Sequence, residues 1–132
     1  PYILHPIRVM QSVEGLDQKM IAVLHDVLED TSVTEEELRQ EGFSEQVIAG
    51  IVSVTRRENE SYADFVVRSS SNEMGRQVKL ADIADNTRLD RTLVSARTIE
   101  KDVKRVRRYL VSYRFLMDQI DEKEYRQLMN DS

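Results

Sequence analysis

The chain has 132 residues, of which 40% are hydrophobic and 33% are charged, a balance that fits a single globular domain with a buried core. It contains no cysteine, which excludes disulfides and thiolate metal sites, and no uncharged apolar run approaches the ~20 residues that a membrane-spanning helix requires. A net charge of −5 argues against broad nucleic-acid binding, which needs clustered cations.

Helices are the expected secondary structure, because only four glycines and two prolines are present to make turns. Pro6 suits the first position of a helix, which places His5 at the start of that helix. Asp17 is expected to cap a second helix that runs without interruption to about Glu29, since apolar residues recur along it at helical spacing.

Capping signals divide the middle of the chain into shorter helices. Thr34 and Glu37 form a capping box before a short acidic helix, and Gly42 is expected to end it. Ser44 and Ser61 each precede a further apolar stretch and are expected to cap two more helices.

The remaining sequence predicts a helix over residues 72–86, a long helix capped by Thr98, and a short helix after the capping box of Asp121 and Glu124. Apolar residues recur along the long helix at alternating steps of four and three: Ile99, Val103, Val106, Leu110, Tyr113, Met117 and Ile120. This stripe lasts only ~3 heptads, so we interpret it as the core-facing side of the helix rather than a coiled coil. The basic residues of the same helix are interpreted as a solvated face: Lys101, Lys104, Arg105, Arg107 and Arg108.

Four polar residues near the end of the second expected helix give the first indication of chemistry. On one continuous helix, His25 and Glu29 would lie about 40° apart, as would Asp26 and Asp30, so all four would share one face. Acids in a last helical turn oppose the helix dipole and repel one another, and a divalent cation would relieve both effects. Imidazole and carboxylate groups are typical ligands of such an ion.

A second polar cluster lies in the helix expected over residues 72–86. Asp82 and Asn86 are one turn apart, and Asp85 lies beside them. An isolated aspartate in such a helix is more often a surface residue or a buried hydrogen-bonded one. Asp82 becomes a candidate ligand through its combination with the two histidines, which are the only histidines of the chain.

The order of His5, the His25–Asp26 pair and Asp82 resembles the H…HD…D signature of the HD-domain metal-dependent phosphohydrolases. The segments PYILHP (1–6), LHDVLEDT (24–31) and VKLAD (78–82) are similar to the RelA/SpoT-type (p)ppGpp hydrolase domain and its small stand-alone relatives. The resemblance implies an all-α, compact HD-domain bundle over residues 1–132, with a metal site between its helices.

The resemblance also implies a role for individual residues. The metal ligands would be His5, His25, Asp26 and Asp82, and the ion would be Mn²⁺ or a similar divalent metal. Glu29 and Asp30 would handle the attacking water, and Asn86, with Arg88 nearby, would contact the nucleotide. The implied reaction removes pyrophosphate from the ribose 3′ position of guanosine tetra- or pentaphosphate.

Two alternatives remain open at this stage: a phosphatase of another nucleotide, or a catalytically weak module that binds a nucleotide and regulates a partner. Four cations are further candidates to receive phosphates, although each is more often a surface residue: Arg56, Arg57, Arg68 and Lys79. Tyr62 is interpreted as a core residue rather than a platform for a base.

The ends of the chain carry two further expectations. No basic leader with an apolar core opens the sequence, so we expect a cytoplasmic protein whose partner is a small-molecule nucleotide rather than a membrane. Because the chain begins at Pro1 rather than at methionine, we expect that a natural N-terminal segment precedes it.

Overall fold

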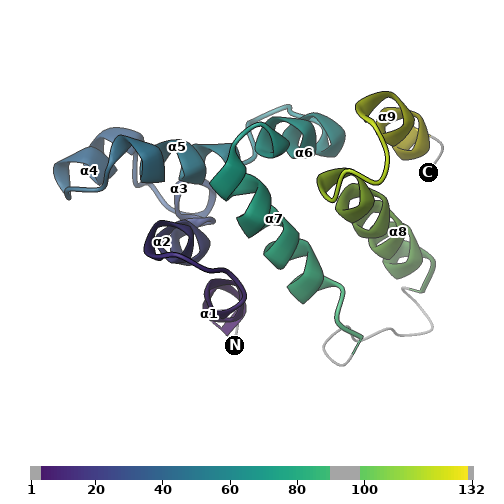
Figure 1. The fold of residues 1–132 in the computed structure, drawn as a ribbon, viewed down its shortest axis with the longest axis horizontal. Helices are drawn as coiled ribbons and strands as arrows, with labels where there is room; N and C mark the ends of the chain where they lie inside the picture. Colours follow the sequence, from purple (N-terminus) through teal and green to yellow (C-terminus); the bar gives the residue numbers. More distant parts are fainter. Residues whose placement is uncertain (1–3, 90–98, 131–132) are drawn as a thin grey trace.

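The computed structural model describes residues 4–89 and 99–130, and every regular element in these ranges is a helix, which confirms the all-α prediction (Figure 1). The helices are α1 (Leu4–Gln11), α2 (Leu16–Leu24), α3 (Val27–Asp30), α4 (Glu35–Gln40), α5 (Glu45–Ser53), α6 (Tyr62–Ser70), α7 (Glu73–Asn86), α8 (Ile99–Leu116) and α9 (Glu122–Asn130). No helix in the described ranges is both long and apolar enough to cross a membrane.

The predicted caps of the middle helices are confirmed. The side chains of Thr34, Ser44 and Ser61 accept hydrogen bonds from the backbone N–H groups at the third helical positions of α4, α5 and α6. Asn72 caps α7 in the same way, and Asp121 accepts from the N–H of Glu124 at 2.8 Å as α9 begins. These side chains satisfy donors that the helix cannot pair internally.

The N-terminal helices differ from the prediction. The first helix includes Leu4, so Pro6 lies inside its first turn rather than at its first position. The second helix follows Gly15, whose φ of 92° favours glycine, and Asp17 lies inside it. This helix also stops at Leu24 and does not continue to Glu29.

The interruption falls at His25, where the side chain competes with the helix. Nδ1 of His25 lies 2.5 Å from the carbonyl oxygen of Ala22, so a side-chain donor occupies this carbonyl where the regular helix ends. Asp26 then precedes the short helix α3. The predicted continuous helix is therefore wrong, and the His25–Asp26 pair lies on a turn between two helices.

Helix α7 separates two apolar clusters (Figure 1). It contacts α1, α2 and α5 on one side, and α6 and α8 on the other. The first cluster includes Val9, Ile21, Ile51 and Val78, and the second includes Val66, Ile83, Val111, Leu116 and Tyr125. Side chains of α7 therefore reach both halves of the molecule.

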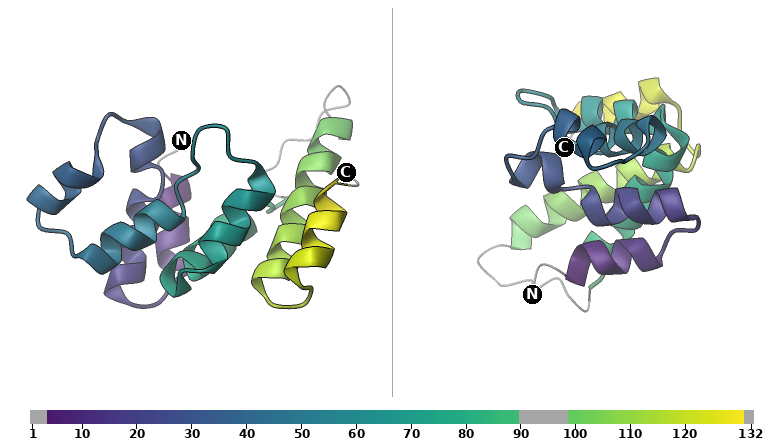
Figure 2. Two further views of the ribbon diagram at one scale, coloured as in Figure 1. Left: turned by 90° about the horizontal axis from the view of Figure 1, so that it is seen from above. Right: turned by 90° about the vertical axis from the view of Figure 1, so that its left-hand side faces the viewer.

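The apolar stripe of α8 faces the core only in part. Tyr113 and Ile120 pack against the second cluster and Val106 is half-buried, as the prediction requires. Ile99, Val103 and Leu110, in contrast, are 50%, 60% and 50% exposed, and Met117, at 47%, lies beyond the helix end. The helix also packs through Ser112, because α9 lies alongside it (Figure 2) and the Ser112 Oγ is 2.7 Å from the Tyr125 hydroxyl. The predicted cap Thr98 lies outside the described residues.

Candidate metal centre

Three buried polar side chains meet where α1, the end of α2 and α7 come together. Nε2 of His5 lies 2.8 Å from Oδ1 of Asp82, and Nε2 of His25 lies 3.4 Å from the same oxygen. Each of these residues offers one ligand atom, and the three atoms lie within 4.8 Å of one another. The fold thus joins the two histidines to Asp82, which follows His5 by 77 positions.

Asp26 lies next to this group but is not one of its three members. Its Oδ2 is 3.5 Å from Nε2 of His25, and its side chain is 26% exposed, whereas those of the other three are at most 10% exposed. The turn at His25 therefore leaves Asp26 at the edge of the group, where a carboxylate can reach the same centre from the solvent side.

Both imidazoles are oriented by a partner on the ring nitrogen away from Asp82. Nδ1 of His5 lies 2.6 Å from Oδ2 of Asp85, whose Oδ1 accepts a hydrogen bond from Nε of Arg8 at 2.8 Å. Nδ1 of His25 must carry a proton, because its partner is the Ala22 carbonyl, which can only accept. Such outer contacts are typical of histidines that bind metal through the opposite nitrogen.

Asp85 and Arg8 were assigned no role from the sequence. Each lies three positions after a candidate ligand, Asp82 or His5, and therefore on the same side of its helix. That spacing is the local signal that could have identified them. It is a weak signal, because it does not show that α1 and α7 are neighbours.

Charges in the group favour an ionised Asp82 and protonated imidazoles when no cation is present. The hydrogen bond to Asp82 raises the pKa of His5. Burial lowers the pKa of His25, but the hydrogen bond and charge of Asp82 outweigh this effect and leave the pKa raised. Burial likewise opposes ionisation of Asp82, yet the Lys79 ammonium, at 2.9 Å, and the imidazoles hold its pKa well below the usual range.

This donor set fits a divalent cation. Two imidazole nitrogens and a carboxylate oxygen converge, with a second carboxylate beside them, which is a mixed N/O environment suited to transition-metal ions. A cation would take the place of the protons that the two Nε2 atoms otherwise share with Asp82, so metal and protons compete for the same atoms.

The two acids expected to handle water lie on α3, both exposed. Oε1 of Glu29 accepts a hydrogen bond from the backbone N–H of Arg56. Partial burial of the carboxylate and the charge of Asp26 raise the pKa of Glu29 despite this bond. The backbone N–H of Asp30 donates to the Asp26 carbonyl at 2.9 Å. The acids therefore lie on a separate short helix beyond the turn at His25, not on the face of one continuous helix.

The two expected nucleotide contacts lie at the C-terminal end of α7. Nδ2 of Asn86 donates to Oδ1 of Asp82 at 3.3 Å, so its amide reaches the candidate ligands. Arg88 follows the end of the helix, where it is exposed and its N–H lies 3.4 Å from the carbonyl of Asp85. The structure therefore brings the side-chain amide of Asn86 to the metal group.

The other candidate phosphate cations have different surroundings. The Arg68 guanidinium forms an ion pair with Glu60 at 2.9 Å and donates hydrogen bonds to the carbonyls of Val52 and Thr55. This pairing lowers the pKa of Glu60 to about 2, chiefly through the hydrogen bond from Arg68. Lys79 pairs with Asp82. Arg56 and Arg57, in contrast, are exposed residues of the loop before α6.

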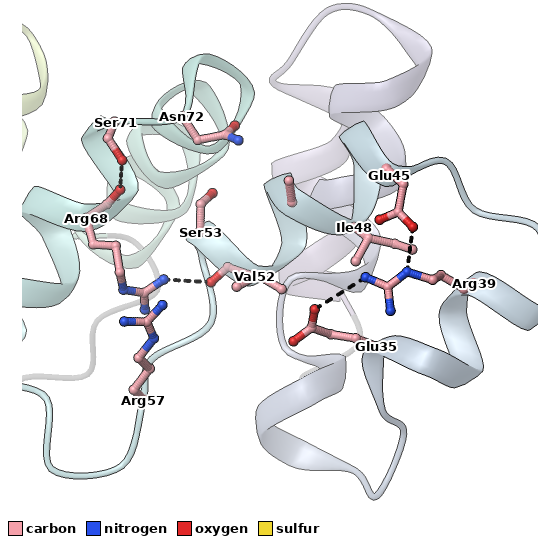
Figure 3. Close-up of a pocket in the computed structure, with 11 residues that line it drawn as sticks. Glu35, Arg39, Glu45, Ile48, Val52, Ser53, Arg57, Arg68, Ser71 and Asn72 are labelled. Carbon is pink, nitrogen blue, oxygen red and sulfur yellow. Dashed lines mark hydrogen bonds and ion pairs between the residues drawn. The ribbon is translucent and has the colours of Figure 1, made fainter.

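A cavity of about 420 Å³ lies away from this centre, against α5 and the start of α4 (Figure 3). Its charged groups largely pair with one another, since Arg39 lies 2.5 Å from Glu45 and 3.9 Å from Glu35. None of the candidate ligands lines it. We therefore assign the site by the convergence of ligand atoms and not by cavity volume.

Two known proteins that are similar to this chain carry the same name. No protein-family model matches the chain. It is 33% identical over 100 residues to the guanosine-3′,5′-bis(diphosphate) 3′-pyrophosphohydrolase of Aquifex aeolicus, which covers 67% of this chain and 14% of that protein. It is 33% identical over 108 residues to the protein of the same name from Haemophilus influenzae, covering 74% of this chain and 16% of that protein. The similarity supports a relationship to RelA/SpoT-type hydrolases, of which this chain spans a small part.

Proposed function

We propose that the chain is a metal-dependent phosphohydrolase of the HD type that acts on a phosphorylated nucleotide. The first candidate substrate is guanosine 3′,5′-bis(diphosphate), with its 3′ pyrophosphate as the leaving group. The observation that carries the proposal is the convergence of two buried, oriented imidazoles on Asp82. The names of the similar proteins support the choice of substrate.

The ion would be held by His5, His25, Asp26 and Asp82, with Mn²⁺ as the first candidate. A divalent ion supplies Lewis acidity toward water and phosphate oxygens. Asp85 and Arg8 would act as positioning residues, because they hold the His5 ring with Nε2 directed at Asp82.

Glu29 would accept the proton of the attacking water, and Asp30 would help to orient that water. In this reaction the water oxygen attacks phosphorus, the bond from phosphorus to the ribose 3′ oxygen breaks, and the 3′ oxygen gains a proton. A carboxylate with a raised pKa is suited to this role, because a base works best when its pKa lies near the operating pH. Asn86 and Arg88 would contact the nucleotide at the end of α7.

Release of phosphate and pyrophosphate from a panel of nucleotides tests the proposal. The panel contains guanosine 3′,5′-bis(diphosphate), nucleoside monophosphates and phosphorylated dinucleotides, each assayed with Mn²⁺ and with excess chelator. We expect chelator-sensitive release of pyrophosphate from the bis(diphosphate). Release from another member alone would change the substrate, and micromolar binding without release from any member would instead identify a regulatory module.

A further inference from the structure

Tyr62, the first residue of α6, has three cationic side chains around its ring among the described residues. Cζ of Arg108 lies 4.8 Å from the ring centroid, Nζ of Lys79 5.4 Å and Cζ of Arg56 5.8 Å. One cation near an aromatic ring is a common stabilising contact, but three around one ring repel one another. They come from α7, α8 and the loop before α6, so the fold brings them together.

Only one of these cations has an acidic partner in the described parts of the chain. Lys79 pairs with Asp82 at 2.9 Å. Arg56 donates through Nε to a backbone carbonyl, that of Glu60, at 3.1 Å, and Arg108 has its two aromatic contacts. By comparison, Arg105 on the same helix as Arg108 does have an acidic partner, Asp102, at 3.1 Å.

Two buried polar atoms in this cluster have no hydrogen-bond partner among the described residues: the hydroxyl of Tyr62 and Nε of Arg108. Buried donors without acceptors destabilise a fold, and most buried polar groups in proteins are paired. A bound anion with several acceptor oxygens would satisfy both donors and offset the repulsion among the cations.

The cluster adjoins the candidate metal centre through Lys79. The same ammonium group that contacts Asp82 also lies 4.7 Å from the centroid of the Phe65 ring and near Tyr62. Arg56 connects the cluster to the site a second time, because its backbone N–H donates to Glu29. An anion beside Tyr62 would therefore lie close to a phosphate held at the metal.

We propose that Arg108, together with Arg56 and the Tyr62 hydroxyl, forms a second anion subsite that binds the phosphate next to the one under attack. The chemical class that it would select is a diphosphate ester rather than a monophosphate ester. This inference rests on the proposed function for its placement in a reaction, but binding of an anion to the subsite is measurable without turnover.

Calorimetric titration of the metal-stripped chain with inorganic pyrophosphate and with orthophosphate tests the subsite directly. We expect tighter binding of pyrophosphate, and a loss of about tenfold or more of that affinity in Arg108→Met, since a hydrogen bond to a charged group is removed. Orthophosphate affinity should change less. The matched control is Arg114→Met, which removes one positive charge from an exposed position of the same helix and should leave both affinities unchanged.

Kinetics with Mn²⁺ and thermal unfolding complete the test. In Arg108→Met, KM for a 3′-diphosphate nucleotide should rise about tenfold with little change in kcat. The melting temperature should not fall, because the substitution removes the buried Nε atom that has no hydrogen-bond partner among the described residues. Unchanged pyrophosphate affinity with a lower melting temperature would overturn the inference and leave Arg108 as a packing residue. Arg108-dependent pyrophosphate binding without turnover of any nucleotide would instead support the subsite and reject the proposed function.

Discussion

The two sides of α7 carry opposite kinds of polar chemistry. Toward α1 and α2, buried donors and acceptors pair with one another, as His5 does with Asp82 and Asp85. Toward α6 and α8, Arg108 and Tyr62 bury polar atoms that have no partner in the described residues. On the proposed function, a cation would replace protons on the first side, and on the further inference an anion would supply acceptors on the second.

Loss of a candidate metal ligand, on the side of α7 that faces α1 and α2, should have the largest effect. Asp82→Asn removes the carboxylate shared by both imidazoles, so metal affinity and turnover should fall by more than about 100-fold, the upper range for loss of an outer contact. Metal content by elemental analysis and phosphate release with Mn²⁺ measure the change.

A control is needed because Asp82→Asn also leaves the Lys79 ammonium buried without its counter-ion, which destabilises the fold. Asp26→Asn keeps that pair and should still weaken metal binding, with helicity unchanged. Full metal content and turnover in both variants would refute the ligand assignment.

A smaller effect is expected when only the outer contact is broken. Asp85→Asn weakens the hold on the His5 ring while Asp82 stays in place, so metal affinity should fall about 10- to 100-fold. Titration with Mn²⁺ gives the affinity. An unchanged affinity would mean that the packing of α1 alone orients His5.

Arg68 of α6 contrasts with Arg108, because it has an acidic partner, Glu60, at 2.9 Å. Glu60 has its pKa lowered to about 2 when folded, against about 4.5 when unfolded. The ionised Glu60 carboxylate therefore contributes to the free energy of unfolding above about pH 4.5, and this contribution is lost as the pH falls toward 2. Glu60→Gln should lower the free energy of unfolding by about 2 kcal/mol at pH 7, less as the pH falls through this window, as denaturant titrations would measure.

The smallest change is expected on the exposed face of α8. Val103→Gln and Leu110→Gln alter side chains that are 60% and 50% exposed, so each should change the free energy of unfolding by less than about 0.5 kcal/mol. A loss of several kcal/mol in thermal or denaturant unfolding would restore the core-facing interpretation. The buried Leu116 on the same helix provides the contrast, since Leu116→Ala should cost about 2–5 kcal/mol.

Local signals predicted the helix starts at Thr34, Ser44 and Ser61, because a cap is decided within one turn of the chain. The motif resemblance selected His5, His25 and Asp82, which the fold brings together. The break at His25 depends on a side chain competing for a helix carbonyl, which periodicity does not report.

The exposure of Ile99, Val103 and Leu110 on α8 could not be predicted for a related reason. Its period is that of a buried face, but which face is buried depends on where α7 and α9 lie. The hydrogen bond of Arg8 to Asp85 and the contact of Arg108 with the Tyr62 ring could not be predicted either, because both join helices that are far apart in the sequence.

The contact between His5 and Asp82 has a thermodynamic consequence for the first helix. It links α1, an element of eight residues, to a helix that begins nearly seventy positions later. An ion that binds both residues only in the folded chain adds RT ln(1 + [M]/Kd) to the free energy of unfolding, or about 2.7 kcal/mol at one hundred times Kd. The attachment of α1 would then strengthen as free metal rises, beyond the hydrogen bonds that already join His5 to Asp82 and Asp85.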